Sequence, residues 1–185
     1  MKRTFLLLIV LLNLTAAGQV KYNYSQFNTL KEVAGTNYVV ATVENWSKMG
    51  GRKNPKLLFI ETKTGQVNQV DAGNGGYFEK IEQVKIDSLG INIIIVSAHT
   101  VDLDGKKGIG WNDPKQLTIF STDGKERTQL TDNKFYTQTW LLNKTAGTII
   151  IIGGYDVNDD GKYDETDKSE IAIYDLKTLK LITKI

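Results

Sequence analysis

The hydrophobic residues of this chain occur in short runs, separated by polar segments rich in Gly, Asn, Asp and Lys. One order of segments recurs three times: aromatic residues, a mixed run that ends in glycine, a β-branched run, a polar loop, a third apolar run and a short last one. The glycines are Gly35, Gly90 and Gly147, which sets the repeat at about 55 residues. Self-similarity at a fixed period predicts several copies of one structural unit.

Each unit is predicted to contain four β-strands. The apolar runs are short, rich in Val, Ile, Thr, Tyr and Phe, and bounded by Gly, Asn and Asp, as is typical of strands. Leu117 and Ile119, and likewise Ile171 and Ile173, recur with period two, and no window beyond the N-terminal segment has a helical period. We therefore expect a single all-β repeat domain over residues 19–185. Its units extend over about residues 22–73, 74–132 and 133–185.

The N-terminal segment has the pattern of a secretory signal peptide. Lys2 and Arg3 precede an unbroken apolar run over residues 5–12, and small residues follow at 15–18. The apolar run is too short to cross a bilayer, which takes about 20 residues in a helix. We predict a signal peptide over residues 1–18, a secreted or periplasmic protein, and no membrane span in the remainder.

Composition and charge exclude several classes of function. The 185 residues include no cysteine and one histidine, which rules out disulfides, thiolate metal sites and multi-histidine metal sites. The chain has 23 basic and 21 acidic residues, and two of the basic ones, Lys2 and Arg3, belong to the leader. A formally neutral mature chain without a basic cluster is not expected to bind nucleic acid.

A four-stranded antiparallel unit of this length is typical of a β-propeller blade. In order and spacing, residues 22–185 resemble the TolB-type, WD40-like propeller repeats of exported bacterial proteins. In that family a Ser-x-Asp-Gly turn joins the first two strands of a blade, and Gly35, Gly90 and Gly147 match its glycine. The resemblance implies a binding scaffold more often than a catalyst.

Three units are fewer than the roughly 4–8 blades of a closed propeller. We therefore expect a partial propeller, or a ring that is completed by a second copy in a homodimer, because an open edge invites pairing with another chain. A blade module that completes a partner protein is an alternative. Another all-β arrangement, a sandwich or a barrel, also remains open.

Residues 156–167 have the spacing of an EF-hand calcium loop, with glycine at its sixth position, Gly161. In this reading alternate residues point their oxygens at a Ca²⁺ ion, and an aspartate replaces the usual glutamate at position 12. An all-oxygen donor set favours calcium over zinc or copper. A solvated acidic turn is the alternative. The predicted ligands are Asp156, Asn158, Asp160, the carbonyl of Lys162, Asp164 and Asp167.

The loop is similar to those of dockerin modules, which also use aspartate at the twelfth position. A helix follows each dockerin loop, whereas Ile171 and Ile173 alternate here as in a strand. We therefore favour a calcium loop between two blade strands over a dockerin module.

The preceding unit carries a weaker version of this loop. Asp102, Asp104 and Gly105 are in step with Asn158, Asp160 and Gly161, but acids are missing at positions 1 and 12. Asp113 lies a little beyond the expected end of the loop. We predict a second, weaker metal site formed by Asp102, Asp104 and Asp113.

No motif of a catalyst accompanies these loops. The nucleophile motif G-x-S-x-G is absent, and we expect His99, after a strand, to be structural. Trp46 and Trp111 fall in inter-strand loops, where they could stack on a sugar ring, whereas Trp140 is expected in the core. The sequence thus favours a non-enzymatic binding or scaffold protein with a protein or glycan ligand. A carbohydrate-active hydrolase or lyase domain of propeller type is the alternative.

Overall fold

The computed structural model describes residues 24–46, 52–73, 75–106 and 108–185. The predicted signal peptide, residues 1–18, lies outside the described residues and stays a prediction. In the described part of the chain, no helix is both long and apolar enough to cross a membrane.

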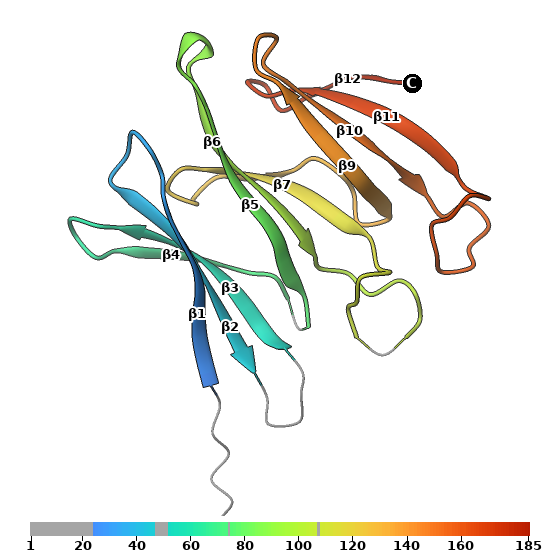
Figure 1. The fold of residues 1–185 in the computed structure, drawn as a ribbon, viewed down its shortest axis with the longest axis horizontal. Coiled ribbons are helices and arrows are strands. Elements are labelled where there is room, and N and C mark those ends of the chain that lie inside the picture. The colour runs from blue at the N-terminus through green and yellow to red at the C-terminus, as the bar shows by residue number, and fades with distance from the viewer. Residues whose placement is uncertain (1–23, 47–51, 74, 107) are drawn as a thin grey trace, which may run out of the picture.

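Twelve strands form three four-stranded antiparallel sheets, each ordered as its strands occur in the chain (Figure 1). Sheet 1 contains β1 (Tyr24–Glu32), β2 (Tyr38–Trp46), β3 (Arg52–Glu61) and β4 (Val67–Asp71). Sheet 2 contains β5 (Tyr77–Ile86), β6 (Ile91–His99), β7 (Lys115–Ser121) and β8 (Arg127–Gln129). Sheet 3 contains β9 (Phe135–Asn143), β10 (Thr148–Tyr155), β11 (Lys168–Asp175) and β12 (Leu181–Lys184). The predicted all-β class and the three four-stranded units are confirmed, and the sheets do not close into a barrel.

The repeated glycines lie where the first strand of each sheet turns into the second. Between β5 and β6 the chain makes one 3-10 turn, η2 (Asp87–Leu89), and Gly90 follows with φ at 66°. A residue without a Cβ adopts this left-handed conformation without strain. Ile86 and Ile91 then pair across the turn, which fixes the register of the two strands.

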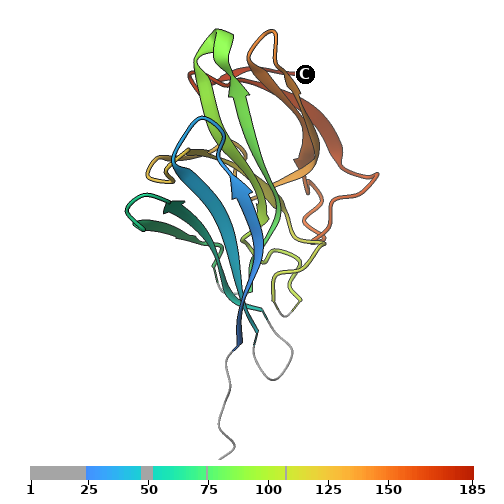
Figure 2. The same ribbon diagram turned by 60° about the vertical axis from the view of Figure 1, so that its left-hand side comes forward.

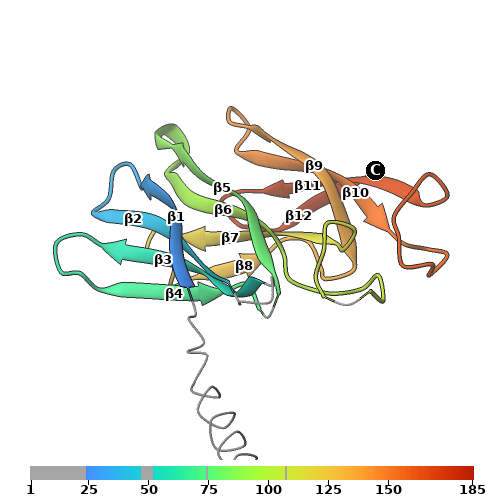
Figure 3. The same ribbon diagram turned by 60° about the horizontal axis from the view of Figure 1, so that its bottom comes forward.

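The sheets pack face to face through two hydrophobic cores (Figure 3). The first core joins sheet 1 to sheet 2, and the second joins sheet 2 to sheet 3. Ile94 and Ile95, neighbours on β6, point into different cores because successive side chains of a strand face opposite sides. The packing repeats, since β3 lies against β5 and β7 against β9. Sheet 2 is therefore covered on both faces.

Sheets 1 and 3 each keep one outward face. On β1, Phe27 and Leu30 are 68% and 74% exposed, and they pair with Val43 and Ala41 of β2. Large exposed side chains of sheet 3 include Leu141, Ile182 and Ile185. The three sheets thus form an open stack of propeller-like blades with apolar surface at both ends.

Tight turns and long loops lie at opposite ends of the sheets. The turns between β5 and β6 and between β9 and β10 lie together at the top of Figure 1, and the view in Figure 2 keeps them together. The β6–β7 and β10–β11 connections hang from the lower end in both views. The fold therefore gathers the two acidic segments that the sequence singles out at one end of the molecule.

Candidate functional site

The β6–β7 acidic loop (residues 100–106 and 108–114) brings three carboxylates together. Asp102, Asp104 and Asp113 each offer one oxygen, and these oxygens lie within 4.8 Å of one another. Asp113 is buried, the Asp104 side chain is 5% exposed, and Asp102 is exposed. In the described part of the chain, they are the one group of acidic or histidine side chains placed in this way. The residues predicted as the weaker metal site are thus the ones that converge.

Asp113 organises this loop through its own side chain. Its Oδ1 accepts hydrogen bonds from the backbone N–H groups of Leu103, at 2.7 Å, and Asp104, at 3.1 Å. Its Oδ2 accepts one from the N–H of Gly110, at 2.8 Å. These charge-assisted bonds fold both arms of the loop around one buried carboxylate.

The other two carboxylates are held by the loop as well. Asp104 accepts a hydrogen bond from the N–H of Lys106, and this bond together with the Lys106 ammonium, 3.2 Å away, holds the pKa of Asp104 below its ordinary value. Asp102 Oδ2 accepts a hydrogen bond from the N–H of Gly108. Of the three carboxylates, only that of Asp104 has an ion-pair partner among the described residues. This oxygen-only donor set with an excess of negative charge suits a hard divalent cation.

The β10–β11 acidic loop (residues 156–167) is held by hydrogen bonds from its backbone to its own carboxylates. Asp156, at position 1, accepts hydrogen bonds from the N–H groups of Asp160 and Gly161. Asp167, at position 12, accepts from Val157 and Asp164. The first and last carboxylates thus tie the loop to itself, although the acids of this loop do not converge as those of the β6–β7 acidic loop do. The six predicted ligands stay a prediction.

The remaining predicted ligands belong to residues that also form hydrogen bonds within this loop. Asn158 donates to Thr166 Oγ1, at 3.0 Å, and the N–H of Lys162 donates to Asp160 Oδ1, also at 3.0 Å. Asp164 accepts from both the N–H and the hydroxyl of Thr166, which lowers the pKa of Asp164. Several side-chain oxygens are therefore already ordered by the backbone of the loop.

The two acidic loops lie against each other. A Cβ placed on Gly161 would stand 3.4 Å from the Cα and the carbonyl oxygen of Asp104. Burial raises the pKa of the Tyr136 phenol, and the nearby negative charges of both loops raise it further. Those charges belong to Asp156, Asp113, Asp104 and Asp167. The sequence offered a signal for this contact, since the loops occupy equivalent positions in consecutive units.

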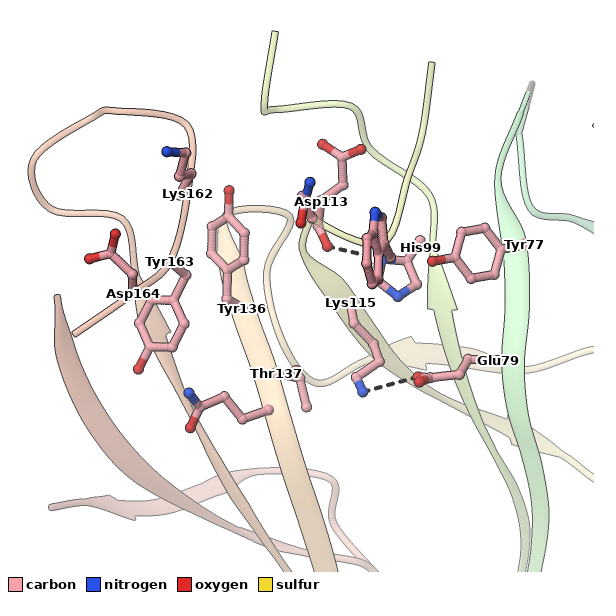
Figure 4. Close-up of a pocket in the computed structure, with 13 residues that line it drawn as sticks. Tyr77, Glu79, His99, Asp113, Lys115, Tyr136, Thr137, Lys162, Tyr163 and Asp164 are labelled. Carbon is pink, nitrogen blue, oxygen red and sulfur yellow. Dashed lines mark hydrogen bonds and ion pairs between the residues drawn. The ribbon is translucent and has the colours of Figure 1, made fainter. Parts of the chain in front are cut away.

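A cleft of about 680 Å³ opens between sheets 2 and 3, beside the acidic loops (Figure 4). We call it the aromatic cleft. Strands β5, β6, β7 and β9 and both acidic loops contribute to its walls. Its aromatic residues are Tyr77, Trp111, Tyr136 and Tyr163. The sequence pointed to Trp111 for ligand contact but not to the three tyrosines, of which Tyr77 belongs to the second unit and Tyr136 and Tyr163 to the third.

Two stacked ring pairs contribute to the walls of the aromatic cleft. Tyr77 stacks on His99 with ring centroids 4.5 Å apart, and Tyr136 stacks on Tyr163 with centroids 5.6 Å apart. The planes of each pair are tilted by only 17° and 15°. Trp111, by contrast, is 85% exposed. The cleft therefore offers rings of fixed orientation together with one indole that is open to solvent.

His99 has a structural position, as predicted, but inside a strand. It is buried at the end of β6, and its Nδ1 donates to the carbonyl oxygen of Asp113 at 2.9 Å, since a carbonyl can only accept. Burial lowers the pKa of the imidazole, which favours the neutral form. The ring thereby joins sheet 2 to the β6–β7 acidic loop.

The other tryptophans also differ in their surroundings. Trp140 packs against the core between sheets 2 and 3, as predicted. Trp46 was expected in a loop, but β2 extends to this residue because polar residues continue the strand pairing, with Trp46 opposite Arg52.

The hydroxyl of Thr137, on β9, is buried but forms no hydrogen bond to any described residue. Its Oγ1 is buried and, among the described residues, is the one buried side-chain oxygen or nitrogen without a hydrogen-bond partner. Such an atom costs about 1–3 kcal/mol relative to a paired one. Because Thr137 lies in the wall of the aromatic cleft, a bound polar group is a natural partner.

An ion pair crosses from β5 to β7 in the same cleft. Lys115 Nζ lies 3.0 Å from Glu79 Oε2, which also accepts a hydrogen bond from Ser97 Oγ at 2.8 Å. Burial raises the pKa of Glu79, but Lys115 and Ser97 lower it by more, so that the pKa lies below its ordinary value. The carboxylate is therefore charged and occupied rather than poised to exchange a proton at neutral pH.

We expect Lys115→Met to raise the pKa of Glu79 above that of the wild type, because burial is then opposed only by Ser97 and by the smaller effect of His99. In the wild type, the contribution of Glu79 to stability is present above its unfolded pKa, about 4.5, and is lost as the pH falls below it. Carboxyl-carbon NMR titration measures the pKa, and urea unfolding against pH measures the stability. Lys125→Met, at an exposed turn beside Asp123, is the control and leaves Glu79 unchanged. An unaltered Glu79 pKa in Lys115→Met contradicts the assignment.

The fold and the acidic loops define an open-ended, all-β protein of stacked four-stranded sheets with a candidate cation centre. No family model and no curated protein sequence matches the chain. An acylaminoacyl peptidase of Pyrococcus horikoshii is similar in structure, with a TM-score of 0.48 and 8% identity over 90% of this chain and 26% of that one. Cobalt-substituted Synechocystis ACO has a TM-score of 0.39 and 12% identity over 92% of this chain and 40% of that one.

A mutant of Synechocystis apocarotenoid oxygenase is similar to the same degree, with a TM-score of 0.37, 12% identity and coverage of 95% and 40%. This chain spans less than half of the length of each of these three proteins. With TM-scores below 0.5, the likeness identifies neither a family nor an activity.

Proposed function

We propose that this protein is an exported, non-enzymatic binding or scaffold protein with propeller-like blades, whose acidic loops hold calcium in a structural role. The convergence of Asp102, Asp104 and Asp113 is the observation that carries the proposal. The β10–β11 acidic loop supplies a second set of oxygens at the same end. In a secreted or periplasmic location, calcium sites with dissociation constants of about 10⁻⁴–10⁻³ M would be useful.

Calcium rather than another metal is supported by the donor chemistry. Carboxylate, amide and carbonyl oxygens are the ligands of hard cations, and the chain has no cysteine and one histidine for softer ones. The ion would offset the mutual repulsion of the clustered acids, which otherwise opposes the folded loops. Since Trp111 and Tyr163 belong to these loops, calcium would also fix part of the aromatic cleft.

The non-enzymatic assignment is supported by how the ionisable groups of the cleft are used. His99 is neutral and donates to a backbone carbonyl, and Glu79 is paired with Lys115. Neither is arranged as the base of an activated nucleophile. The hydrolase or lyase alternative would need a carboxylate pair acting on a bound sugar, and assays for polysaccharide cleavage test it.

Completion of the stack by another chain is a second role, favoured by the exposed apolar side chains on its outward faces. Phe27 and Leu30 at one end and Leu141 and Ile185 at the other have the character of residues that pack between blades. A homodimeric ring and a blade module for a partner protein both stay predictions, as does the identity of any protein ligand.

We expect calcium to raise the melting temperature. A ligand at ten times its dissociation constant stabilises the folded state by about 1.4 kcal/mol, or roughly 3–6 °C for a chain of this size. Asp102→Asn, at an exposed ligand, and Asp160→Ala, in the second loop, each remove part of the shift. Differential scanning calorimetry at increasing calcium concentrations, with isothermal titration for the number of ions, measures both effects.

Asp87→Asn serves as the control for these variants. Asp87 is exposed and lies in the turn after β5, away from the acidic loops. This variant keeps the full calcium response. An unchanged melting curve of the wild-type protein at millimolar calcium, with no heat of binding, refutes the calcium site.

A further inference from the structure

From the geometry we infer that the aromatic cleft is a binding site for a neutral carbohydrate, gripped between sheets 2 and 3. The inference names the ligand class of the proposed binding function and rests on that function, but it does not require calcium to be the bound ion. The cleft measures about 680 Å³ and lies between two blades, with walls drawn from four strands and two loops.

The aromatic rings supply the first line of support. The Tyr77–His99 and Tyr136–Tyr163 pairs come from sheet 2 on one side and from β9 and the β10–β11 acidic loop on the other (Figure 4). Each ring is locked by its partner, so binding costs little side-chain entropy. A sugar presents apolar C–H faces, which pack on such rings, and Trp111 adds an exposed indole plane at the same cleft.

The polar groups supply the second line. Thr137 Oγ1 is buried without a partner in the cleft wall, and a ligand hydroxyl can both donate to it and accept from it. Asn112 and Gln138 add side-chain amides, which also serve as donors and acceptors. Groups that both donate and accept hydrogen bonds are suited to the hydroxyl groups of a sugar, which do the same.

The charge balance argues for a ligand without net charge. Two lysines, Lys115 and Lys162, line the cleft together with three carboxylates. Lys115 is already paired with Glu79, and Asp113 is occupied by loop N–H groups. The lining therefore has one negative charge in excess, which opposes an anionic ligand, and the partners of Glu79 and Asp113 leave little to attract a strongly cationic one.

The test is affinity electrophoresis of the full chain in gels that contain one soluble neutral polysaccharide each: a xylan, a galactomannan, a β-glucan and a dextran, all at millimolar calcium. At least one retards the wild-type protein. Trp111→Ala weakens that retardation roughly tenfold or more, as expected for an aromatic hot spot, whereas Trp111→Phe keeps much of it. Tyr163→Ala acts in the same direction from the opposite wall.

Phe27→Ala is the matched control, because it removes an exposed ring on the outward face of sheet 1 and leaves the retardation intact. Trp111 is so exposed that its loss leaves the melting curve unchanged, which separates binding from folding. Retardation by none of the four polysaccharides, retardation only by an acidic polysaccharide, or equal retardation of wild type and Trp111→Ala overturns the inference.

The inference and the proposed function fail in different measurements. If the calcium-dependent melting shift is present but no neutral polysaccharide binds, the carbohydrate site is wrong and the calcium site stands. If a polysaccharide binds through Trp111 but calcium does not change the melting temperature, the carbohydrate site stands and the calcium site is wrong. If the bound polysaccharide is shortened, the cleft stands as the carbohydrate site and the non-enzymatic assignment is wrong.

Discussion

Phe59→Ala is expected to lower the free energy of unfolding by about 3–5 kcal/mol. Phe59 is fully buried on β3, where its ring contacts Phe120 of β7 with centroids 5.6 Å apart. The ring also lies directly on Gly124, in the turn before β8, so closely that a Cβ there would overlap it. One side chain of sheet 1 thus fills the space against two elements of sheet 2, and its truncation leaves a cavity that neither rigid sheet can close.

Urea unfolding of the two proteins measures this difference. Natural domains have about 5–15 kcal/mol of stability in total, so the variant is expected to be close to unfolding at 37 °C. Phe27→Ala is the control, since the same truncation on the 68%-exposed outward face leaves no cavity and changes stability by less than about 1 kcal/mol. Equal effects of the two substitutions would show that sheet 1 does not pack on sheet 2 through β3.

Gly153→Ala is the second substitution with a large expected effect. Gly153 lies on β10 opposite Thr137, beside a register shift between β9 and β10. An added Cβ would overlap the carbonyl oxygen of Tyr136 and stand 2.6 Å from Cε1 of Phe135. Because the overlap is with backbone, no change of rotamer relieves it, and we expect a loss of about 1–3 kcal/mol or more.

The same substitution is expected to damage the aromatic cleft, because it displaces the start of β9, where Tyr136 and Thr137 lie. Thermal unfolding and polysaccharide affinity are therefore both reduced. Gly110→Ala is the control, since a Cβ there has an ordinary 3.9 Å contact with Asp113 and changes stability by less than about 0.5 kcal/mol. A Gly153→Ala protein as stable as the wild type would mean that β9 and β10 do not pair in this register.

Strands such as β6 and β7 were predictable because each has a buried stretch with a clear apolar pattern, whereas β4, β8 and β12 contain no buried residue. The run at residues 93–96 marks β6, and the run at 117–120 marks β7. Strand ends were less predictable, since polar residues can continue a ladder without burying anything. Lys53 pairs with Asn45 in this way, which extends β3 well before its apolar run at residues 57–60.

The acidic site was predictable in its residues but not in its geometry. Counted from the glycine at position 6, Asp113 arrives two residues later than the acid that would close a standard loop. The longer loop nevertheless folds back on Asp113 through the N–H groups of Leu103 and Gly110. Sequence spacing can identify a loop of standard length. The way Asp113 closes this longer loop depends instead on tertiary contacts, such as the hydrogen bond from His99 to the Asp113 carbonyl.

The aromatic cleft was not predictable, because Tyr77, Tyr136 and Tyr163 carry no motif of their own. Tyr77 lies near the other two because sheets 2 and 3 pack together, and Tyr163 reaches Tyr136 from the loop after β10. A repeat register can indicate which positions become neighbours, but ring orientation follows from contacts such as the Tyr163 hydroxyl with Ser169 Oγ, at 2.8 Å.

Because sheet 2 is buried on both faces, the outer sheets are expected to unfold locally more easily than the central sheet. Either outer sheet can detach by separating from one neighbour, whereas β6 and β7 open only after both cores have come apart. We therefore expect the amide protons of β6 and β7 to be the slowest to exchange with solvent in a hydrogen-exchange measurement. Local fluctuations are then concentrated in sheets 1 and 3, whose outward faces are the surfaces to which an additional blade would attach.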